Sequence, residues 1–370
     1  MADDNLNMLK KTPLYEQHKR LGARMADFAG WYMPIQYEHG ILSEYRQVRE
    51  KAGIFDISHM GEFVIDGEFV SSGLDRIVTM RLDNLQPNRG RYGMILNEVG
   101  GIIDDLIVFC IEKEKWFIVV NAANIEKDAS HFKANLSSDS IFTDISADIG
   151  KLDVQGPLSR EILTNFIDEI DKLDYYTFDY FELLGEKVVV SRTGYTGELG
   201  YEIYFPAYRV AELWQMLLSD DRLKPAGLGA RDLLRIEMGY SLYGHELRED
   251  ISPIEAGLER FVWFEKDFIG KETLLRKKAE GVDRTLTGII SDTRRSPRGG
   301  NRILSEGGEE IGLVTSGGFS PALNKGIGLG FIKKAYSSLG DRIYFCNGQG
   351  KKSPAVISER IFFRNGSLKD

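Results

Sequence analysis

Three runs of apolar and β-branched residues follow one another closely in the first half of the chain: Arg91–Ile95, Ile102–Phe109 and Trp116–Asn121. This composition predicts three strands. The segments between the runs are too short to contain the helical crossover that parallel neighbours need, so we expect the strands to pair antiparallel. The block therefore argues against a regular alternation of strands and helices, and it predicts an α+β fold with antiparallel sheets.

Two adjacent aspartates, Asp104 and Asp105, interrupt the middle strand of this block. Because side chains alternate along a strand, the two carboxyls belong to opposite faces, and both faces are otherwise apolar. Burial of an unpaired carboxylate is costly and raises its pKa towards working pH, which makes the pair a candidate for acid–base chemistry. A strand-edge pair that binds backbone groups fits the same spacing. The pattern does not select one of the two aspartates.

Other patterns predict helices, further strands and a separate C-terminal unit. The predicted helices are residues 43–52, 121–133, 210–218, 229–238 and one that begins at Pro157. A strand pair is predicted near 61–65, a polar separating segment at 135–146, and a hairpin from 187–192 and 201–205. The charged segment 271–284 predicts a linker. Short strands then recur at 285–291, 310–315, 326–332, 342–345 and 355–362, which predicts an all-β barrel or sandwich.

Composition narrows the classes of function. A chain of 370 residues suggests two or three domains, and a formal net charge of -9 argues against a nucleic-acid partner. We expect no membrane span, because no run approaches the roughly 20 apolar residues that a span needs, and no secretory signal. The two cysteines, Cys110 and Cys346, fit a reducing compartment. The five histidines are scattered and no metal-ligand spacing occurs, so we expect no metal site.

A glycine-rich segment surrounds Tyr195, with Gly194, Gly197 and Gly200 close to it. A strand follows these glycines, so no helix N-terminus is offered to a pyrophosphate, and a dinucleotide site is not expected. The segment is better interpreted as a hairpin loop with Tyr195 at its tip. On the returning strand, Glu202 could accept two parallel hydrogen bonds from a flat heterocycle that stacks on nearby aromatic rings. A solvated glutamate on an edge strand is the alternative.

Two arginines, Arg231 and Arg235, lie four residues apart on one predicted helix. They could bind an acidic ligand tail bidentately, or they could form a surface ladder with Asp232 and Glu237. A buried acid, a heterocycle-binding acid, an arginine pair and stacking rings together describe a site for a flat ring with an acidic tail. A folate has that shape.

Many ordered motifs carry a resemblance to a known family. They are 12–15 (TPLY), 28–31 (FAGW), 33–37 (MPIQY), 53–61 (GIFDISHMG), 100–105 (GGIIDD), 191–198 (SRTGYTGE), 230–232 (ARD) and 252–258 (SPIEAGL). With these motifs the chain resembles the aminomethyltransferases, or T-proteins, of the glycine cleavage system over nearly its whole length. The resemblance implies a three-domain cloverleaf in which two mixed α/β domains with antiparallel sheets and a C-terminal β-barrel surround a central folate cavity.

The same resemblance implies domain limits and a reaction. Residues 1–275 would form the folate-binding aminomethyltransferase region, with two interleaved subdomains of which the smaller spans roughly 55–145, and residues 283–370 would form the barrel. Members of the family transfer the one-carbon unit from the aminomethyl-dihydrolipoyl H-protein to tetrahydrofolate, giving 5,10-methylenetetrahydrofolate, ammonia and dihydrolipoyl H-protein. The resemblance implies tetrahydrofolate as co-substrate without a metal and the lipoylated H-protein as partner. It implies an enzyme of the cytosolic or mitochondrial type, and we predict a cytoplasmic location.

The resemblance also assigns roles to single residues. Asp105 matches the catalytic carboxylate, so we expect a structural role for Asp104. Glu202 matches the acid that binds the pterin edge. The other matching folate positions are Tyr92, Asn121, Tyr195, Arg231 and Tyr240, the apolar wall positions Met60 and Ile107, and Arg364 near the variable C-terminus.

Three other functions compete with this interpretation. The folate domain of a sarcosine- or dimethylglycine-oxidising flavoprotein would need a flavin-binding region, for which the chain has no fingerprint. A folate-dependent iron–sulfur assembly factor carries a Lys-Gly-Cys motif where this chain has Arg192–Glu198 without a cysteine. A protein that binds folate without turnover is opposed by the intact Asp105.

Overall fold

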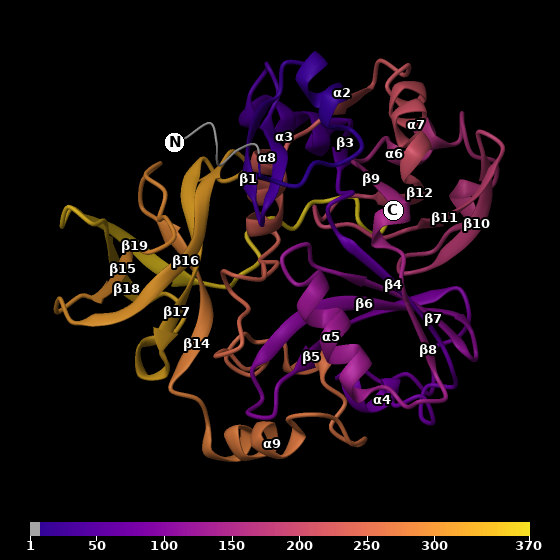
Figure 1. The fold of residues 1–370 in the computed structure, drawn as a ribbon. Coiled ribbons are helices and arrows are strands. Elements are labelled where there is room, and N and C mark those ends of the chain that lie inside the picture. The colour runs from indigo at the N-terminus through magenta and orange to yellow at the C-terminus, as the bar shows by residue number, and fades with distance from the viewer. Residues whose placement is uncertain (1–7) are drawn as a thin grey trace.

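The computed structural model describes residues 8–370, which form two open sheets, a closed barrel and a small N-terminal hairpin. Figure 1 shows the barrel, in orange and yellow, beside the two open sheets, in magenta and indigo, with connecting segments between them. Strands and helices do not alternate regularly, and all but one of the strand pairs in the sheets are antiparallel, as the spacing of the strand block predicts. The α+β class is confirmed.

The five-stranded sheet contains the acidic pair. Its order is β5 (Arg89–Leu96), β6 (Ile102–Glu112), β7 (Lys115–Val120), β4 (Gly61–Asp66) and β8 (Ile141–Asp144). Met94 pairs with Asp105 and Ile95 with Asp104, so both aspartates lie on a central strand. The helices α4 (Leu74–Ile77) and α5 (Ile125–Asn135) share an apolar core with this sheet.

The six-stranded sheet has one apolar face and one polar face. Its order is β10 (Phe178–Leu183), β11 (Glu186–Ser191), β12 (Gly200–Pro206), β9 (Ile149–Gln155), β3 (Ala52–Asp56) and β13 (Leu223–Pro225). The apolar side chains of β9 and β12 pack with α6 (Ser159–Leu163) and α7 (Val210–Leu217) in one core. The polar side chains of the same two strands face the opposite way, towards the candidate site.

The C-terminal strands close into a barrel, which confirms the prediction of a β unit there. The barrel order is β14 (Arg284–Ser291), β17 (Lys325–Lys333), β16 (Glu310–Ser320), β15 (Arg302–Ser305), β18 (Arg342–Cys346) and β19 (Lys352–Ser358), with β19 returning to β14. The strand β15 has no counterpart among the predicted strands.

The remaining elements connect these units. They are α2 (Tyr15–Arg20), β1 (Arg24–Phe28), β2 (Trp31–Gln36), α3 (Ile41–Glu50), α8 (Leu228–Glu237), α9 (Lys271–Glu280) and the short 3-10 helices η1 (Ser146–Asp148), η2 (Ile170–Lys172), η3 (Ala207–Arg209), η4 (Glu259–Phe261) and η5 (Lys334–Tyr336). The helices α3 and α8 pack against each other, and α8 also packs against β16 of the barrel. Among residues 8–370, no helix is long and apolar enough to cross a membrane.

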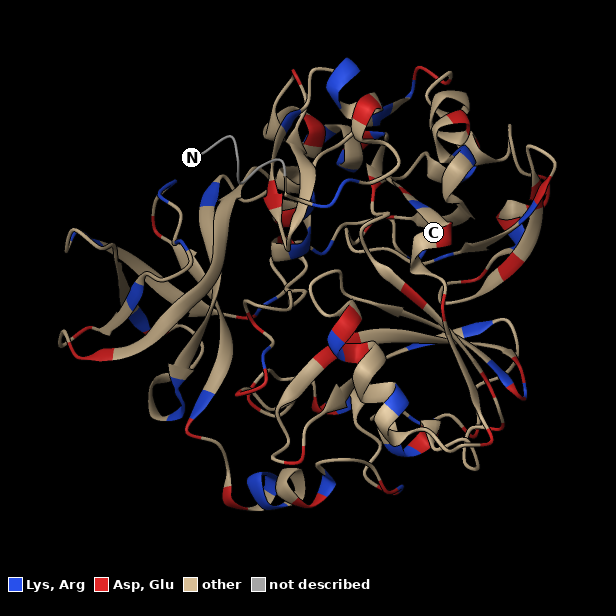
Figure 2. Cartoon of the chain, viewed as in Figure 1, with Lys and Arg blue, Asp and Glu red and all other residues tan. Residues whose placement is uncertain are grey.

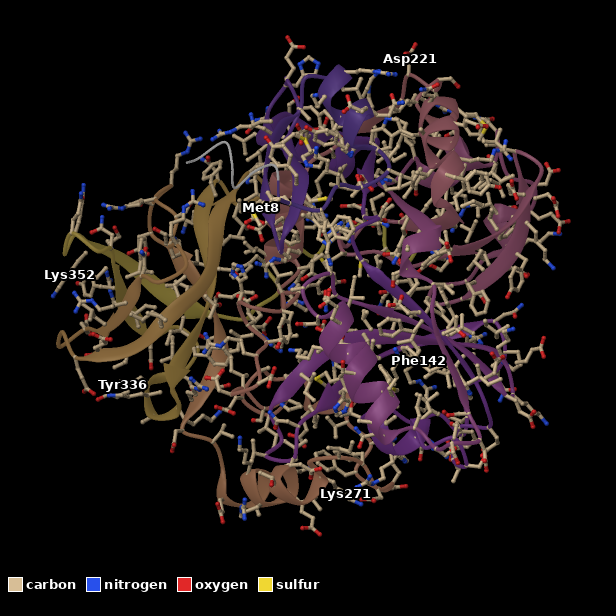
Figure 3. The ribbon with its side chains drawn as sticks, viewed as in Figure 1. Met8, Phe142, Asp221, Lys271, Tyr336 and Lys352 are labelled. Carbon is tan, nitrogen blue, oxygen red and sulfur yellow. The ribbon has the colours of Figure 1, made fainter. Side chains whose placement is uncertain are left out.

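The prediction of a linker at 271–284 is wrong over most of its length, because α9 occupies Lys271–Glu280. This helix buries only Leu274, so its sequence lacks the apolar stripe by which a core-facing helix is recognised. Figure 2 shows both basic and acidic residues along α9, and Lys271, labelled in Figure 3, begins the helix at the outer edge of the molecule.

Several predicted element bounds are also wrong. The helix predicted to begin at Pro157 is shorter than expected, because only α6 is helical and the rest of the apolar stripe lies in a turn. The helix predicted to begin at residue 121 begins only at Ile125. The helix expected over 43–52 ends at Glu50, because Ala52 already belongs to β3. The polar segment 135–146 contains the edge strand β8, which has only four residues, of which Ile141 and Phe142 are apolar. The last barrel strand ends at Ser358 rather than at 362.

We keep the domain limits as a proposal. The first barrel strand begins at Arg284, just after the predicted boundary at 283. The five-stranded sheet spans 61–144 and lies in the chain between β3 and β9, which are neighbours in the six-stranded sheet. Both observations favour two interleaved units within residues 1–275 and a barrel in residues 283–370.

Candidate active site

Asp105 lies on β6 with hydrogen-bond donors on both of its carboxyl oxygens. The Tyr92 hydroxyl donates to Oδ2 at 2.9 Å, and Asn121 Nδ2 donates to Oδ1 at 2.8 Å. Tyr92 pairs with Ile107, two residues from Asp105, so both side chains belong to the same face of the sheet. The Asp105 side chain is partly exposed, and so its carboxyl is within reach of a ligand.

Burial raises the pKa of Asp105 to about 7, and the charge of Asp104 acts in the same direction. The hydrogen bonds from Tyr92 and Asn121 oppose this rise but do not cancel it. No cation forms an ion pair with Asp105 among the described residues. A carboxyl with such a pKa can hold or release a proton near neutral pH, which is the property required of a general acid or base.

Asp104 is fully buried and is held by amide donors. Its carboxylate accepts from the Asn121 backbone N–H at 3.0 Å, from Asn121 Nδ2 at 2.9 Å and from Asn124 Nδ2 at 2.6 Å. Asn121 therefore bridges the two aspartates. These contacts support a structural role for Asp104, with Asp105 as the accessible member of the pair.

Glu202 lies on β12, which is an inner strand between β11 and β9. Its Oε2 is 3.0 Å from Lys151 Nζ and accepts a hydrogen bond from the Tyr204 hydroxyl at 3.2 Å. The alternative of a solvated glutamate on an edge strand is therefore wrong. Burial works to raise the pKa of Glu202, but Lys151 and Arg231 outweigh it and hold the pKa below its usual value.

Arg231 projects from α8 into the same region. It forms an ion pair with the buried Asp153 on β9 and lies 5.3 Å from the ring centre of Tyr195. Tyr195 in turn stacks on Tyr240 with 5.6 Å between ring centres and an interplanar angle of 24°. The structure thus brings together Arg231, Tyr195 and Tyr240, three of the predicted folate positions.

The expectation that Arg231 and Arg235 bind one acidic tail together is wrong, and of the alternative ladder only the ion pair of Arg235 with Asp232, at 2.8 Å, is present. Arg235 is buried, and its guanidinium contacts Glu246 at 2.8 Å and the Ser316 hydroxyl at 2.8 Å, so it joins α8 to the barrel strand β16. Glu237 is also buried and accepts from Arg49, so it takes no part in a surface ladder. Residues four apart on a helix differ by about 40° in direction, which here separates a site residue from a core residue.

Met60 and Ile107 pack against one apolar cluster that joins the two open sheets and contains Phe109 and Tyr204. Met60 Sδ is also 3.9 Å from Lys151 Nζ. Arg364 is different, because its side chain is 61% exposed and is paired with Glu359. The structure records no contact between Arg364 and the other predicted site residues, and its assignment stays a prediction.

Lys151, Asp153 and Gln155 were missed as site residues although the sequence contains a signal for them. They alternate with the core residues Leu152 and Val154 along β9, the period expected of a strand with one polar face. Asp153 is completely buried, and burial raises its pKa to about 6 while Arg231 opposes the rise. The polar face of this sheet is therefore a buried charge network around Glu202.

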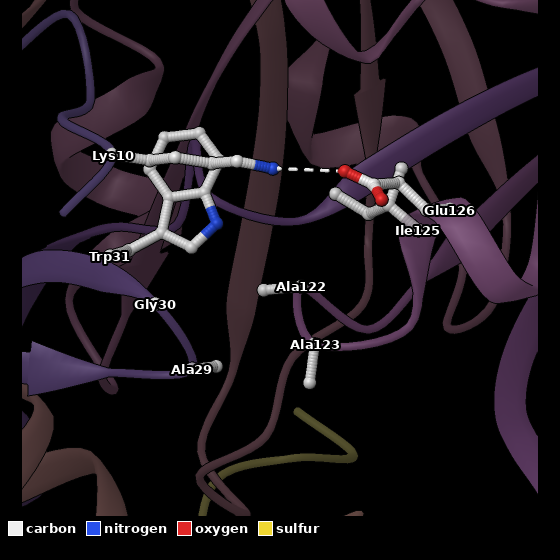
Figure 4. Close-up of a pocket in the computed structure, with 8 residues that line it drawn as sticks. All are labelled: Lys10, Ala29, Gly30, Trp31, Ala122, Ala123, Ile125 and Glu126. Carbon is white, nitrogen blue, oxygen red and sulfur yellow. Dashed lines mark hydrogen bonds and ion pairs between the residues drawn. The ribbon is translucent and has the colours of Figure 1, made fainter. Parts of the chain in front are cut away.

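A pocket of about 220 Å³ lies between the turn of the N-terminal hairpin and the start of α5 (Figure 4). Ala122 and Ala123 in its wall directly follow Asn121, the residue that bridges the aspartates. Lys10 Nζ and Glu126 Oε1 are 3.5 Å apart at its rim. The full lining is Lys10, Ala29, Gly30, Trp31, Ala122, Ala123, Ile125 and Glu126.

Two open sheets and a barrel make up this α+β protein. Its acidic site lies between the two open sheets, so the protein belongs to the class in which several structural units share one site. Residues 14–266 match the GCVT N-terminal domain, and residues 284–364 match the glycine cleavage T-protein C-terminal barrel domain. The chain belongs to the glycine cleavage T-protein family.

Individual relatives support this placement. The chain is 44% identical to an aminomethyltransferase of Halothermothrix orenii, with 90% of this chain and 95% of that protein covered. It is 43% identical to an aminomethyltransferase of Caldanaerobacter subterraneus subsp. tengcongensis, with 99% of each covered. The crystal structure of the glycine cleavage system aminomethyltransferase T from Bartonella henselae has a TM-score of 0.91 and 32% identity, covering 97% of this chain and 99% of that one.

Proposed function

We propose that this chain is the aminomethyltransferase of a glycine cleavage system. It transfers the one-carbon unit of aminomethyl-dihydrolipoyl H-protein to tetrahydrofolate, and the products are 5,10-methylenetetrahydrofolate, ammonia and dihydrolipoyl H-protein. The observation that carries the proposal is Asp105, a partly exposed carboxyl with a raised pKa that is held by Tyr92 and Asn121. Relatives that are more than 40% identical over nearly the whole chain are aminomethyltransferases, which supports it.

The reaction explains why one carboxyl of this kind is sufficient. The carbon–sulfur and carbon–nitrogen bonds of the aminomethyl group break, the sulfur leaves as a thiol and the amine leaves as ammonia. Two folate nitrogens each exchange a proton for a bond to the carbon. Asp105 as the anion stabilises positive charge that develops on that carbon and guides the departing protons. No covalent bond to the protein is needed, and positioning of two large substrates contributes strongly to the rate.

Glu202 and the rings near it fit the other end of the proposed site. As an anion held by Lys151, Glu202 can accept two parallel hydrogen bonds from the N–C–N edge of a pterin. The stacked Tyr195 and Tyr240 offer a flat aromatic surface, and Arg231 adds a fixed positive charge. We assign Met60 and Ile107 to the apolar wall.

We also propose tetrahydrofolate as the co-substrate, a lipoylated H-protein as the partner and the cytoplasm as the location. The family membership and the names of the relatives favour the first two assignments. The location follows from the sequence prediction of a reducing compartment.

The test measures ammonia release from aminomethyl-loaded, lipoylated H-protein with and without tetrahydrofolate. We expect rapid release only when folate is present, with an equal amount of 5,10-methylenetetrahydrofolate formed. Tight folate binding without ammonia release would contradict the transferase assignment and favour an assembly factor or a binding protein.

A further inference from the structure

A third acid, Asp128, lies buried behind the aspartate pair. It belongs to α5, and its backbone N–H donates to Asn124 O at 2.7 Å. Its side chain is 0% exposed, and neither of its oxygens meets an N–H or hydroxyl donor among residues 8–370. A carboxylate buried without a donor is unfavourable, so the group that faces Asp128 decides its state.

Asn124, one helical turn before Asp128, donates to the Asp104 carboxylate at 2.6 Å, and the negative charge of Asp104 acts on Asp128. Two neighbouring buried carboxyls can form a hydrogen bond only when one of them carries a proton. The surroundings are unequal, because three N–H donors from Asn121 and Asn124 already point at Asp104 and none points at Asp128. Donors stabilise an anion, so the geometry places the proton on Asp128 and the charge on Asp104.

The other titratable groups around the acids do not reverse this order. Lys127 on α5 favours a charged Asp128, but its ammonium bonds to the Tyr243 hydroxyl at 2.7 Å and to Glu249 at 2.9 Å. Burial, followed by the charge of Asp104, raises the pKa of Asp128 to about 11. On β5, Tyr92 donates to Asp105 and is neutral near pH 7, since burial and then Asp105 raise its pKa. Tyr243 is also neutral, because burial raises its pKa.

We propose that Asp128 is a positioning residue that, as a neutral acid, donates a hydrogen bond to Asp104 and so keeps Asp104 ionised next to Asp105. Asp128 does not touch Asp105 or a substrate. It acts through Asp104, whose negative charge opposes the ionisation of Asp105 across the shared Asn121 amide. The part of the inference that concerns catalysis rests on the proposed function, whereas the ordering of the three protons does not.

The direction of the effect follows from the chain of contacts. Without the Asp128 donor, Asp104 is less stable as an anion and takes up a proton at a higher pH. A neutral Asp104 no longer repels charge on Asp105, and the pKa of Asp105 therefore falls. An asparagine at position 128 still offers an N–H to Asp104, so it leaves the pKa of Asp105 where it is.

The experiment is a carboxyl ¹³C NMR titration of the ligand-free, aspartate-labelled protein from pH 4 to pH 9. The Asp105 signal is assigned by its loss in Asp105→Asn. We expect Asp128→Ala to lower the titration midpoint of Asp105 by about one pH unit, which is tenfold in the ionisation constant, and Asp128→Asn to leave it unchanged. The surface variant Asp139→Asn is the control and leaves it unchanged as well.

A second variant keeps the test decisive if Asp128→Ala does not fold. Asp104→Asn removes the same charge directly, and we expect it to lower the Asp105 midpoint as Asp128→Ala does. In the double variant the two shifts should not add, because both act through one charge. An unchanged midpoint in Asp104→Asn, or a lowered midpoint in Asp128→Asn, would overturn the proposal, since the second result would mean that Asp128 itself carries the charge.

The same variants distinguish this inference from the proposed function. The acid limb of the pH–rate profile of aminomethyl transfer should move with the NMR midpoint in Asp128→Ala and stay in place in Asp128→Asn. If the NMR shifts occur but the protein does not release ammonia from the H-protein, the proton order stands and the proposed function fails. If transfer occurs without any NMR shift, the proposed function stands and the role of Asp128 fails.

Discussion

Asp105 and Glu202 are both carboxyls on inner strands of neighbouring sheets, yet their surroundings drive their pKa values in opposite directions. Asp105 is faced by another acid and by neutral donors, and its pKa rises to about 7. Glu202 is faced by Lys151 and Arg231, and its pKa falls below the usual value. Burial alone therefore does not decide protonation, because a nearby cation reverses its effect. This division leaves one carboxyl suited to moving protons and the other to binding as an anion.

The largest expected effect comes from removing the ionisable group on the Asp105 side. Asp105→Asn keeps the size but cannot exchange a proton, and one of the two donors that face the carboxyl then meets an amide NH2 group. We expect turnover to fall about a hundredfold to ten-thousandfold, while folate binding stays within about threefold. Steady-state kinetics and calorimetric folate titration measure the two quantities, with Asp139→Asn as the surface control. A fully active Asp105→Asn protein would remove Asp105 from the chemistry.

Lys151→Met tests whether the cation beside Glu202 causes the difference between the pKa values of Glu202 and Asp105. Removal of one partner from a buried ion pair leaves an uncompensated charge, so we expect a loss of about 3 kcal/mol in the free energy of unfolding at pH 7. Folate binding should weaken as well, because Glu202 then takes up a proton more readily. Denaturant unfolding measures the stability. Lys224→Met is the control, because the Lys224 side chain is 51% exposed. This substitution should change the free energy of unfolding by less than about 0.5 kcal/mol.

The pH dependence of stability should carry the opposite sign on the two sides. For Asp105, the folded pKa is about 7 and the unfolded value is near 3.8, so the folded state holds the extra proton between these values. Stability is therefore lost as pH rises through this window, by up to about 4 kcal/mol from this group. Denaturant unfolding measures the free energy of unfolding at pH 5 and at pH 8. Between these two pH values it should decrease less in Asp105→Asn than in the unchanged protein. An equal decrease in both would contradict the raised pKa.

The lowered pKa of Glu202 gives the reverse dependence. Its contribution to stability is present above the unfolded pKa and is lost as pH falls through the lower, folded pKa. Glu202→Gln should therefore lose less stability on acidification below about pH 4 than the unchanged protein. A decrease of the same size in both proteins would mean that Glu202 is not the anion proposed here.

The smallest effects separate Arg231 from Arg364. Arg231→Ala should weaken folate binding about tenfold, because it removes a fixed cation beside Tyr195 and Glu202. Arg364→Ala should change it by less than about twofold if the exposed pair with Glu359 is its only contact. Calorimetric titration with tetrahydrofolate measures both. Equal effects of the two substitutions would show that the C-terminal arginine reaches the ligand after all.

The antiparallel strand block and the barrel could be predicted because both depend on local spacing. Short turns between Arg91 and Asn121 leave no other pairing. The acidic pair between apolar residues identifies Asp104 and Asp105 as candidates, and the family resemblance selects Asp105. The partners of Glu202 and Arg235 could not be predicted in this way, because Lys151 and Glu246 are brought to them by the packing of distant segments. The helix α9 escaped prediction because it faces solvent on nearly all sides.

The strand β3 has two neighbours in its sheet, β9 and β13, and both are made later than the whole five-stranded sheet. During synthesis, β3 is an apolar strand with unsatisfied edges until at least Ile149 has left the ribosome. All five of its residues are buried in the finished protein, so this interval exposes a segment that could pair with other chains. The inserted sheet is therefore in a position to fold first, and the larger sheet, which carries Glu202, is completed only after it.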